Sequence, residues 1–303
     1  MPELPEVSTI VEQLKKELVG KTITGVEVRL PKVWQEDGDP HSAKASRGKQ
    51  VLGSKITDVR RRAKMIIIKL NNNKNLVVHL KMTGQLVLGS LSNQSKSKQT
   101  LVIYPNPIPF AGTTLPGKTT HIIFDLDSNL RLFFNDMRQF GWIKVLDDDE
   151  LNEISEKHGP EALSEEFTVE YLTKILSNWG RPVKLLLLDQ TKISGIGNIY
   201  ANEALWYAGI SPMKRGRSLS HESKSKIEDL YQAIKKVLEM GIKYHGSSAG
   251  DEAYVDAYGH GGQMQEHTIV YQKNGSPCPR CGKTITRSTI GGRGTFFCPK
   301  CQA

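Results

Sequence analysis

The spacing of hydrophobic positions changes about halfway along the chain. Near the N-terminus, Ile10, Val11, Leu14 and Leu18 recur at helical spacing and predict an amphipathic helix over 7–19. Short apolar runs separated by turn residues follow, a pattern typical of an antiparallel β-sandwich or barrel. The predicted strands are 22–30, 51–60, 65–70, 76–80, 85–88, 121–126, 130–135 and 142–145.

The second half has helical spacing instead. Its predicted helices are 171–177, 183–188, 199–208 and 221–240. We therefore expect a sandwich domain over 1–146, a linker over 147–160, a helical domain over 161–268 and a separate C-terminal element over 269–303. Residues 89–118, rich in Ser, Lys, Gln, Pro and Gly, have the composition of a surface insertion.

All four cysteines lie in the last 26 residues, as two Cys-x2-Cys pairs separated by sixteen residues. Such pairs supply four thiolates to one Zn²⁺ in a closed tetrahedral shell. Two short strands around a Gly-Gly turn are predicted between them, so we expect a structural zinc β-hairpin with one Zn²⁺ per chain. The alternatives, two disulfides or four free thiols, suit a reducing compartment less well. The predicted ligands are Cys278, Cys281, Cys298 and Cys301.

The charge balance is basic, with 41 Lys and Arg against 32 Asp and Glu and a formal net charge of +9. This surplus suits a polyanionic partner such as nucleic acid, although solubility alone also explains it. Residues 273–303 carry six basic side chains and no acidic one, which suits contact with phosphates. No apolar run reaches the roughly 20 residues of a membrane span, and no signal peptide is evident, so we expect a cytoplasmic protein without a membrane partner.

The first three residues carry a candidate reactive group. Pro2 permits removal of Met1, which exposes a secondary amine whose ordinary pKa is about 8. The neutral amine can attack a sugar carbon that bears a base, expel the base and leave an iminium link. Glu3 lies beside it, placed to act as acid or base on the sugar oxygen. The alternative is that Pro2, Pro5 and the glutamates only cap the first helix.

Six motifs in order give the chain a family resemblance: MPELPEV, RRAKMIIIKL, HLKMTGQL, NDMRQFG, LLLDQTKISGIGNIYANEAL and GGRGTFFCPKCQ. The chain resembles the formamidopyrimidine-DNA glycosylases, which are relatives of endonuclease VIII. The resemblance implies an α+β multidomain fold: an N-terminal β-sandwich with a catalytic N-terminal helix, a helix–two-turn–helix domain and a C-terminal zinc β-hairpin held by four cysteines. It also implies a monomeric, nucleoid-associated repair enzyme acting on double-stranded DNA with an oxidised or abasic site.

The resemblance implies a bifunctional DNA glycosylase and AP lyase that removes 8-oxoguanine and formamidopyrimidines. Pro2 would form a Schiff base with C1′, and Glu3 would act as acid and base on the sugar. Lys64 would contact phosphate and assist β-elimination. Arg293 would bind phosphates that flank the extruded nucleotide and assist δ-elimination.

DNA-binding roles are implied as well. A methionine, an arginine and a phenylalanine fill the space left by the extruded base in this family. Residues 246–266 occupy the place of its lesion-recognition loop. The implied DNA-binding residues are Met82, Arg138, Phe140, Asn198, His121 and Arg181.

Some positions depart from the family pattern, notably Gln139 and Thr119, where basic residues or histidine are frequent. These departures redistribute phosphate contacts without touching the catalytic set. Leu4 together with the three space-filling residues favours the oxidised-purine branch over an endonuclease VIII-like pyrimidine glycosylase. A non-catalytic damaged-DNA-binding protein is a further alternative, and the intact Pro2, Glu3, Lys64 and Arg293 argue against it.

Overall fold

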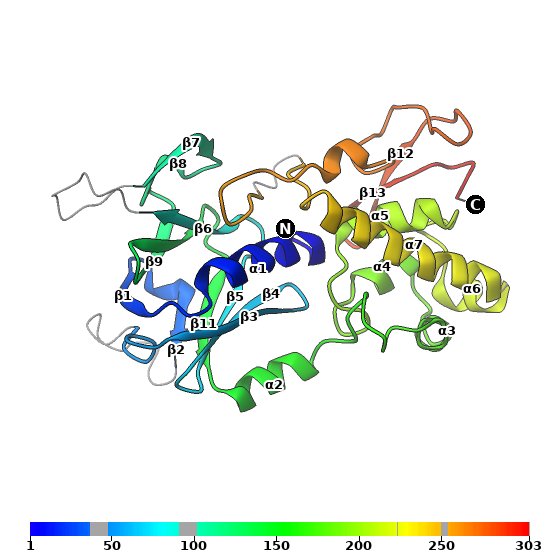
Figure 1. Cartoon of the computed structure of the whole chain (residues 1–303). Helices are drawn as coiled ribbons and strands as arrows, with labels where there is room; N and C mark the ends of the chain where they lie inside the picture. The colour runs from blue at the N-terminus through cyan, green and yellow to red at the C-terminus, as the bar shows by residue number, and fades with distance from the viewer. Residues whose placement is uncertain (37–47, 91–101, 223, 250–253, 303) are drawn as a thin grey trace. The chain divides into compact units, whose positions relative to one another are not determined.

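The computed structural model describes the chain except residues 37–47, 91–101, 223, 250–253 and 303. The chain forms two compact units (Figure 1). The first comprises Met1–Ser155 together with Tyr244–Gln263, and the second comprises Glu156–Lys243 together with Met264–Ala303. The predicted helical domain is therefore interrupted, because residues 244–263 pack with the sandwich.

Two sheets and one helix form the first unit. Helix α1 spans Leu4–Leu18. The antiparallel four-stranded sheet has the order β1 (Ile23–Val28), β9 (Thr120–Leu126), β10 (Leu130–Asp136), β6 (Gly84–Ser90). The five-stranded sheet has the order β2 (Trp34–Glu36), β11 (Trp142–Leu146), β5 (Asn75–His79), β4 (Met65–Leu70), β3 (Ile56–Arg62), with only β2 and β11 parallel.

The core of this unit explains the uninterrupted apolar run of β4. Ile66 and Ile68 point into the main core, which both sheets and α1 share. Met65 and Ile67, on the opposite face, pack with Leu151 of α2 (Asp148–Glu156) in a separate cluster. Because successive side chains of a strand alternate between faces, a strand covered on both sides needs apolar residues at nearly every position.

The described part of the predicted insertion is ordered. It forms a further hairpin, in which β7 (Val102–Ile108) pairs with β8 (Gly112–Leu115). Earlier in the chain, a short 3-10 turn, η1 (Pro31–Val33), directly precedes β2. The hairpin packs its own small apolar cluster on the four-stranded sheet. Residues 91–101 of the insertion lie outside the described residues.

Helices dominate the second unit, which also carries the C-terminal hairpin. Its elements are α3 (Val169–Ser177), α4 (Val183–Leu188), α5 (Asn198–Tyr207), α6 (Gly216–Glu222), α7 (Lys224–Lys243), the 3-10 turn η2 (Met264–His267), β12 (Thr286–Ile290) and β13 (Arg293–Phe297). Within the described residues, no helix combines the length and apolar character that crossing a bilayer requires.

The predicted fold class is confirmed, and several elements differ in detail. Helix α1 begins at Leu4 rather than at residue 7, because Pro5 fits the first turn and Glu6 accepts the Glu3 N–H. The predicted linker over 147–160 contains α2. At its start, the Asp147 side chain accepts the Glu150 N–H and the Glu150 side chain accepts the Asp147 N–H, both at 2.9 Å. The single helix predicted over 221–240 is two helices, α6 and α7. Strand β2 has no counterpart in the prediction.

Candidate active site

The N-terminal turn is buried and tightly held. Pro2 is buried, and Glu3 is only 2% exposed at the N-terminus of α1. The Glu3 N–H donates to Glu6 Oε2 at 2.8 Å, and the Ser247 N–H donates to Glu6 Oε1 at 2.8 Å. The helix dipole favours carboxylates at this end. The turn that carries the predicted nucleophile and acid/base is thus fixed by hydrogen bonds from two segments.

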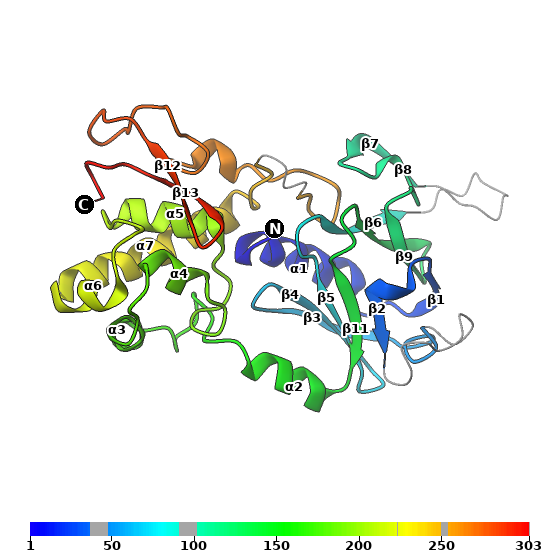
Figure 2. The same ribbon diagram turned by 180° about the vertical axis from the view of Figure 1, so that it is seen from behind.

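Lys64 lies in the β3–β4 turn and is only 5% exposed. A Lys15–Asp58 ion pair of 2.8 Å holds the start of β3 beside the last turns of α1. Strands rise about 3.3 Å and helices about 1.5 Å per residue, so β3, with 7 residues, is about as long as α1, with 15 residues. The β3–β4 turn therefore lies at the N-terminal end of α1, as Figures 1 and 2 show. The fold brings Lys64 to the end that carries Pro2 and Glu3.

Asp136 braces two turns that carry predicted DNA-contacting residues. Its buried carboxylate accepts the Thr83 hydroxyl, the Arg138 N–H at 3.1 Å and the Gly141 N–H at 2.7 Å. Turn 81–84, with Met82, is thereby joined to turn 137–141. Asp136 and Thr83 were not predicted from the sequence. Their only signal was a position next to the recognised motif residues.

The side chains on these braced turns project outward. Phe140 is 57% exposed, so its ring does not pack in the core. Arg138 is exposed, and its Cζ lies 5.3 Å from the centre of the Phe140 ring, a cation–π distance. Met82 is half-buried, and Gln139 is exposed. The predicted space-filling set therefore lies on neighbouring, rigidly held turns of one unit.

His121 has a supporting position. It is 6% exposed, and its Nε2 lies 2.7 Å from the Asp136 carbonyl oxygen. The Thr119 carbonyl accepts the Asp136 N–H. His121 therefore holds the main chain beneath the exposed turn, and we do not retain it among the DNA-contacting residues.

In the second unit, Asn198 is the first residue of α5. The preceding loop is held by Gln190, which donates to the Ile196 carbonyl at 2.8 Å and accepts the Gly195 N–H at 3.0 Å. Gly197 is the N-cap of α5 and makes no side-chain cap hydrogen bond. Arg181 is exposed in the same unit, with its guanidinium over the Trp179 ring.

The four cysteines meet as predicted. Their Sγ atoms all lie within 4.8 Å of one another, with Cys278–Cys301 at 3.9 Å and Cys281–Cys298 at 3.5 Å. A tetrahedral zinc with Zn–S bonds of about 2.3 Å requires sulfur separations of roughly 3.8 Å. No disulfide joins them. The geometry fits one structural Zn²⁺ and leaves no ligand position for catalysis.

The ionisation of these thiols also fits a cation. Despite the opposing effect of burial, main-chain N–H groups and the Trp206 indole lower the pKa of Cys278 to about 6. Burial and the neighbouring thiols raise the pKa of Cys301 to about 12. Four thiolates this close repel one another, and a bound divalent cation removes that repulsion.

A buried lysine fixes the hairpin that carries Arg293. Gly291 and Gly292, both with positive φ, form the turn before the exposed Arg293. Lys184 of α4 is fully buried and donates to the Gly294 carbonyl and the Thr295 hydroxyl, both at 2.8 Å. Lys184 was not predicted from the sequence, although a lysine inside the apolar run VKLLLL was a usable signal.

Glu203 holds the segment that leads to the zinc hairpin. Its buried carboxylate accepts the N–H groups of Ile269, Val270 and Tyr271 at 2.8–2.9 Å. Burial raises the pKa of Glu203, and the three N–H groups act in the opposite direction. This residue thereby ties α5 to the segment before the first zinc ligands.

Replacing Glu203 by glutamine tests this bracing. The amide NH₂ would face at least one main-chain N–H, and the unsatisfied donors should destabilise the protein by about 1–3 kcal/mol. Urea unfolding measures the change, with Glu239→Gln on the surface of α7 as control. Equal midpoints for the two variants would show that the three hydrogen bonds contribute nothing net.

Three family models match the chain. Residues 1–143 match the formamidopyrimidine-DNA glycosylase N-terminal domain, residues 158–252 the H2TH domain of the same enzymes, and residues 275–303 a zinc finger found in FPG and IleRS. A formamidopyrimidine-DNA glycosylase of Chloroflexus aurantiacus is 41% identical over 303 residues, covering 100% of this chain and 98% of that protein.

Solved structures agree over the full length. A Lactococcus lactis FPG variant in complex with Fapy-dG-containing DNA has a TM-score of 0.81 at 30% identity, covering 99% of each chain. MutM in complex with DNA containing carbocyclic 8-oxo-G has a TM-score of 0.80 at 30% identity, again covering 99% of each chain. With the matched domains, the four-cysteine cluster and full-length relatives all in agreement, the chain belongs to the formamidopyrimidine-DNA glycosylase family.

Proposed function

We propose that the protein is a base-excision-repair DNA glycosylase and AP lyase that removes oxidised purines from duplex DNA. The observation that carries the proposal is the buried N-terminal turn, where Glu6 holds Glu3 beside Pro2. Lys64 lies at the same end of α1. A nucleophile, an acid/base and a cation on rigid elements are the groups that displacement at a sugar carbon requires.

The chemistry begins with the Pro2 amine, freed by removal of Met1. Its lone pair attacks C1′, and the damaged base leaves with the electrons of the glycosidic bond. Glu3 protonates the ring oxygen as the ring opens, which yields the iminium at C1′. Loss of a C2′ proton then expels the 3′ phosphate, and a second elimination expels the 5′ phosphate. Lys64 and Arg293 stabilise the phosphates as they leave.

Binding and extrusion use side chains on the turns and loops of each unit. Met82, Arg138 and Phe140 fill the space of the extruded nucleotide. Asn198, Arg181 and Arg293 contact the DNA backbone. Zinc, held by the four cysteines, keeps the Arg293 hairpin folded and takes no part in bond breaking. The DNA of the nucleoid is the proposed place of action, and the protein acts as a monomer.

The lesion class follows from relatives whose structures contain Fapy-dG or 8-oxo-G. Strand cleavage should be measured on matched duplexes carrying 8-oxoguanine, formamidopyrimidine-guanine, thymine glycol or no lesion. Cleavage of both purine lesions with little at thymine glycol is the expected result. Preference for thymine glycol would assign the pyrimidine branch, and binding without cleavage of any duplex would assign a non-catalytic protein.

Removing the metal should separate DNA binding from stability. With Zn²⁺ chelated, the cysteines lose their shared ligand and the Arg293 turn loosens. Affinity for lesion DNA should fall at least tenfold, whereas most of the thermal unfolding transition persists, because the sandwich has a core of its own. Metal analysis of reduced protein should return one Zn²⁺ per chain. Well under one would contradict the site.

The salt dependence of binding should identify phosphate contacts. Each phosphate contact contributes roughly one unit to the slope of log affinity against log salt. Replacing Arg293 or Lys64 by alanine should flatten that slope by about one unit. Arg131→Ala, which removes an equal charge already paired with Asp125 at 2.6 Å, serves as the matched control. Slopes equal to that of the control would exclude backbone contact by either residue.

A further inference from the structure

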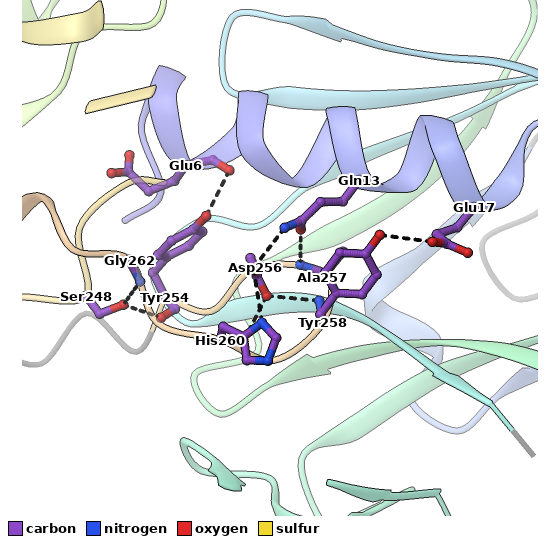
Figure 3. Close-up of polar contacts among 10 residues, drawn as sticks. All are labelled: Glu6, Gln13, Glu17, Ser248, Tyr254, Asp256, Ala257, Tyr258, His260 and Gly262. Carbon is purple, nitrogen blue, oxygen red and sulfur yellow. Dashed lines mark hydrogen bonds and ion pairs between the residues drawn. The ribbon is translucent and has the colours of Figure 1, made fainter. Parts of the chain in front are cut away.

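Residues 244–249 and 254–263, here named the α1 loop, lie along α1 (Figure 3). The described parts close on themselves near the ends of the loop. The Gln263 N–H donates to the Tyr244 carbonyl at 2.9 Å, and the Gly262 N–H donates to Ser248 Oγ at 2.9 Å. Ser248 Oγ in turn donates to the Tyr254 carbonyl at 2.6 Å. These hydrogen bonds join the two described parts of the loop to each other.

Its first attachment is Glu6, the residue that also holds the N-terminal turn. One carboxylate oxygen accepts the Ser247 N–H and the other accepts the Glu3 N–H, both at 2.8 Å. Gly246 has a φ of +80°, and a Cβ there would lie 2.7 Å from Glu6 Cγ. The loop backbone therefore approaches Glu6 as closely as a glycine allows.

The second attachment lies two helical turns further along α1. Gln13 Nε2 donates to Asp256 Oδ2 at 2.8 Å, and Gln13 Oε1 accepts the Ala257 N–H at 2.9 Å. Asp256 is 6% exposed, and its other oxygen accepts the N–H groups of Tyr258 at 2.9 Å and His260 at 2.8 Å. The Gln13 side chain thus donates through its NH₂ group and accepts through its oxygen, both to one buried turn of the loop.

The opposite side of the loop rests on the β7–β8 hairpin. Val255 is buried in the same apolar cluster as Tyr104 and Ile108 of β7. The Ala257 carbonyl accepts the Leu88 N–H of β6 at 2.7 Å. The loop is therefore enclosed between α1 and the described part of the 89–118 insertion, which gives that insertion a structural role.

We propose that Gln13 and Asp256 are positioning residues for base excision. They hold the α1 loop in the register that keeps the Ser247 N–H on Glu6, and Glu6 in turn holds Glu3 beside the Pro2 amine. A displacement of about 1 Å at a reacting group can cost a hundredfold in rate. The proposal rests on the proposed function, because it assigns the reaction to this N-terminal turn.

The test uses charge at the Gln13–Asp256 contact. Gln13→Glu places a carboxylate against the Asp256 carboxylate, so the contact breaks. Adding Asp256→Asn restores it: the new amide donates to the new carboxylate, while its oxygen still accepts the Tyr258 and His260 N–H groups. Glu17→Gln, on the exposed contact between Glu17 and Tyr258 of 3.0 Å, is the control, because an amide oxygen still accepts that hydroxyl.

Single-turnover kinetics on 8-oxoguanine DNA should show a maximal excision rate constant about tenfold lower for Gln13→Glu. The protein concentration that gives half of that rate should change by less than about threefold. The double variant should regain most of the rate, and Glu17→Gln should match the parent protein. Cleavage at preformed abasic sites should suffer less than excision. The proposal would be overturned if Gln13→Glu excised at the full rate or if the double variant did not recover. It would also be overturned if the loss of excision rate only followed a loss of melting temperature.

Hydrogen exchange gives a readout independent of catalysis. The amides of Ala257 and Ser247 should exchange faster in Gln13→Glu and return to the parent rate in the double variant. Unchanged exchange at Ser247 would show that the two attachments are not coupled and would overturn the proposal. If the parent protein fails to excise 8-oxoguanine at all, the proposed function is wrong instead, and the two failures are distinguishable.

Discussion

Replacing Glu3 by glutamine is expected to lower the rate of 8-oxoguanine excision by about 10²–10⁴-fold. Glutamine keeps the size of the side chain but cannot give or take the proton that ring opening requires. Cleavage at preformed abasic sites should be largely retained, because no damaged base has to leave there. Single-turnover assays on the two substrates measure the difference directly.

Glu12→Gln is the matched control, since Glu12 is exposed on the same helix and has the same chemistry. It should excise at the rate of the parent protein. Borohydride trapping at abasic sites by Glu3→Gln would show that the N-terminal amine remains competent. Equal excision by the two variants would remove Glu3 from the acid/base role and leave it as a helix cap.

Blocking the Pro2 nitrogen is expected to abolish strand cleavage and trapping. A protein that retains residues before Pro2 carries an amide nitrogen there, whose lone pair is delocalised and not nucleophilic. The same preparation, after a protease has exposed Pro2, should regain full activity. Binding to lesion DNA should differ little between the two forms, and gel-shift titration checks this. Pro2→Gly is a weaker test, because it leaves a primary amine.

Local patterns predicted the elements whose boundaries depend on their own residues. The observed β4 and α4 have the predicted bounds, because an apolar run buried on both faces and a short helix bounded by Pro182 are visible in the sequence. Strand β2 was not predicted, because three residues gain strand character only by pairing in parallel with β11, far along the chain. Gly-rich polar sequence likewise gave no sign that residues 244–263 pack on α1.

In the candidate site, too, local motifs were predicted and contacts between distant segments were not. Motifs located Pro2, Glu3 and the cysteines, and the structure gathers the cysteines as expected, while the catalytic roles stay predictions. The bracing residues were missed, because Asp136 acquires its partners from two turns that meet only in the folded sheet. His121 was predicted to bind DNA, yet it is buried and its Nε2 lies 2.7 Å from the Asp136 carbonyl oxygen.

Mass mapping of the borohydride-trapped adduct tests the central claim most directly. Protein with a free N-terminus is trapped on 8-oxoguanine DNA, digested, and analysed for the peptide that retains the sugar remnant. The account predicts the remnant on the nitrogen of Pro2, in the N-terminal peptide and in no other. A remnant on the side chain of Lys64 or any other lysine would contradict the mechanism, even though the family assignment would stand.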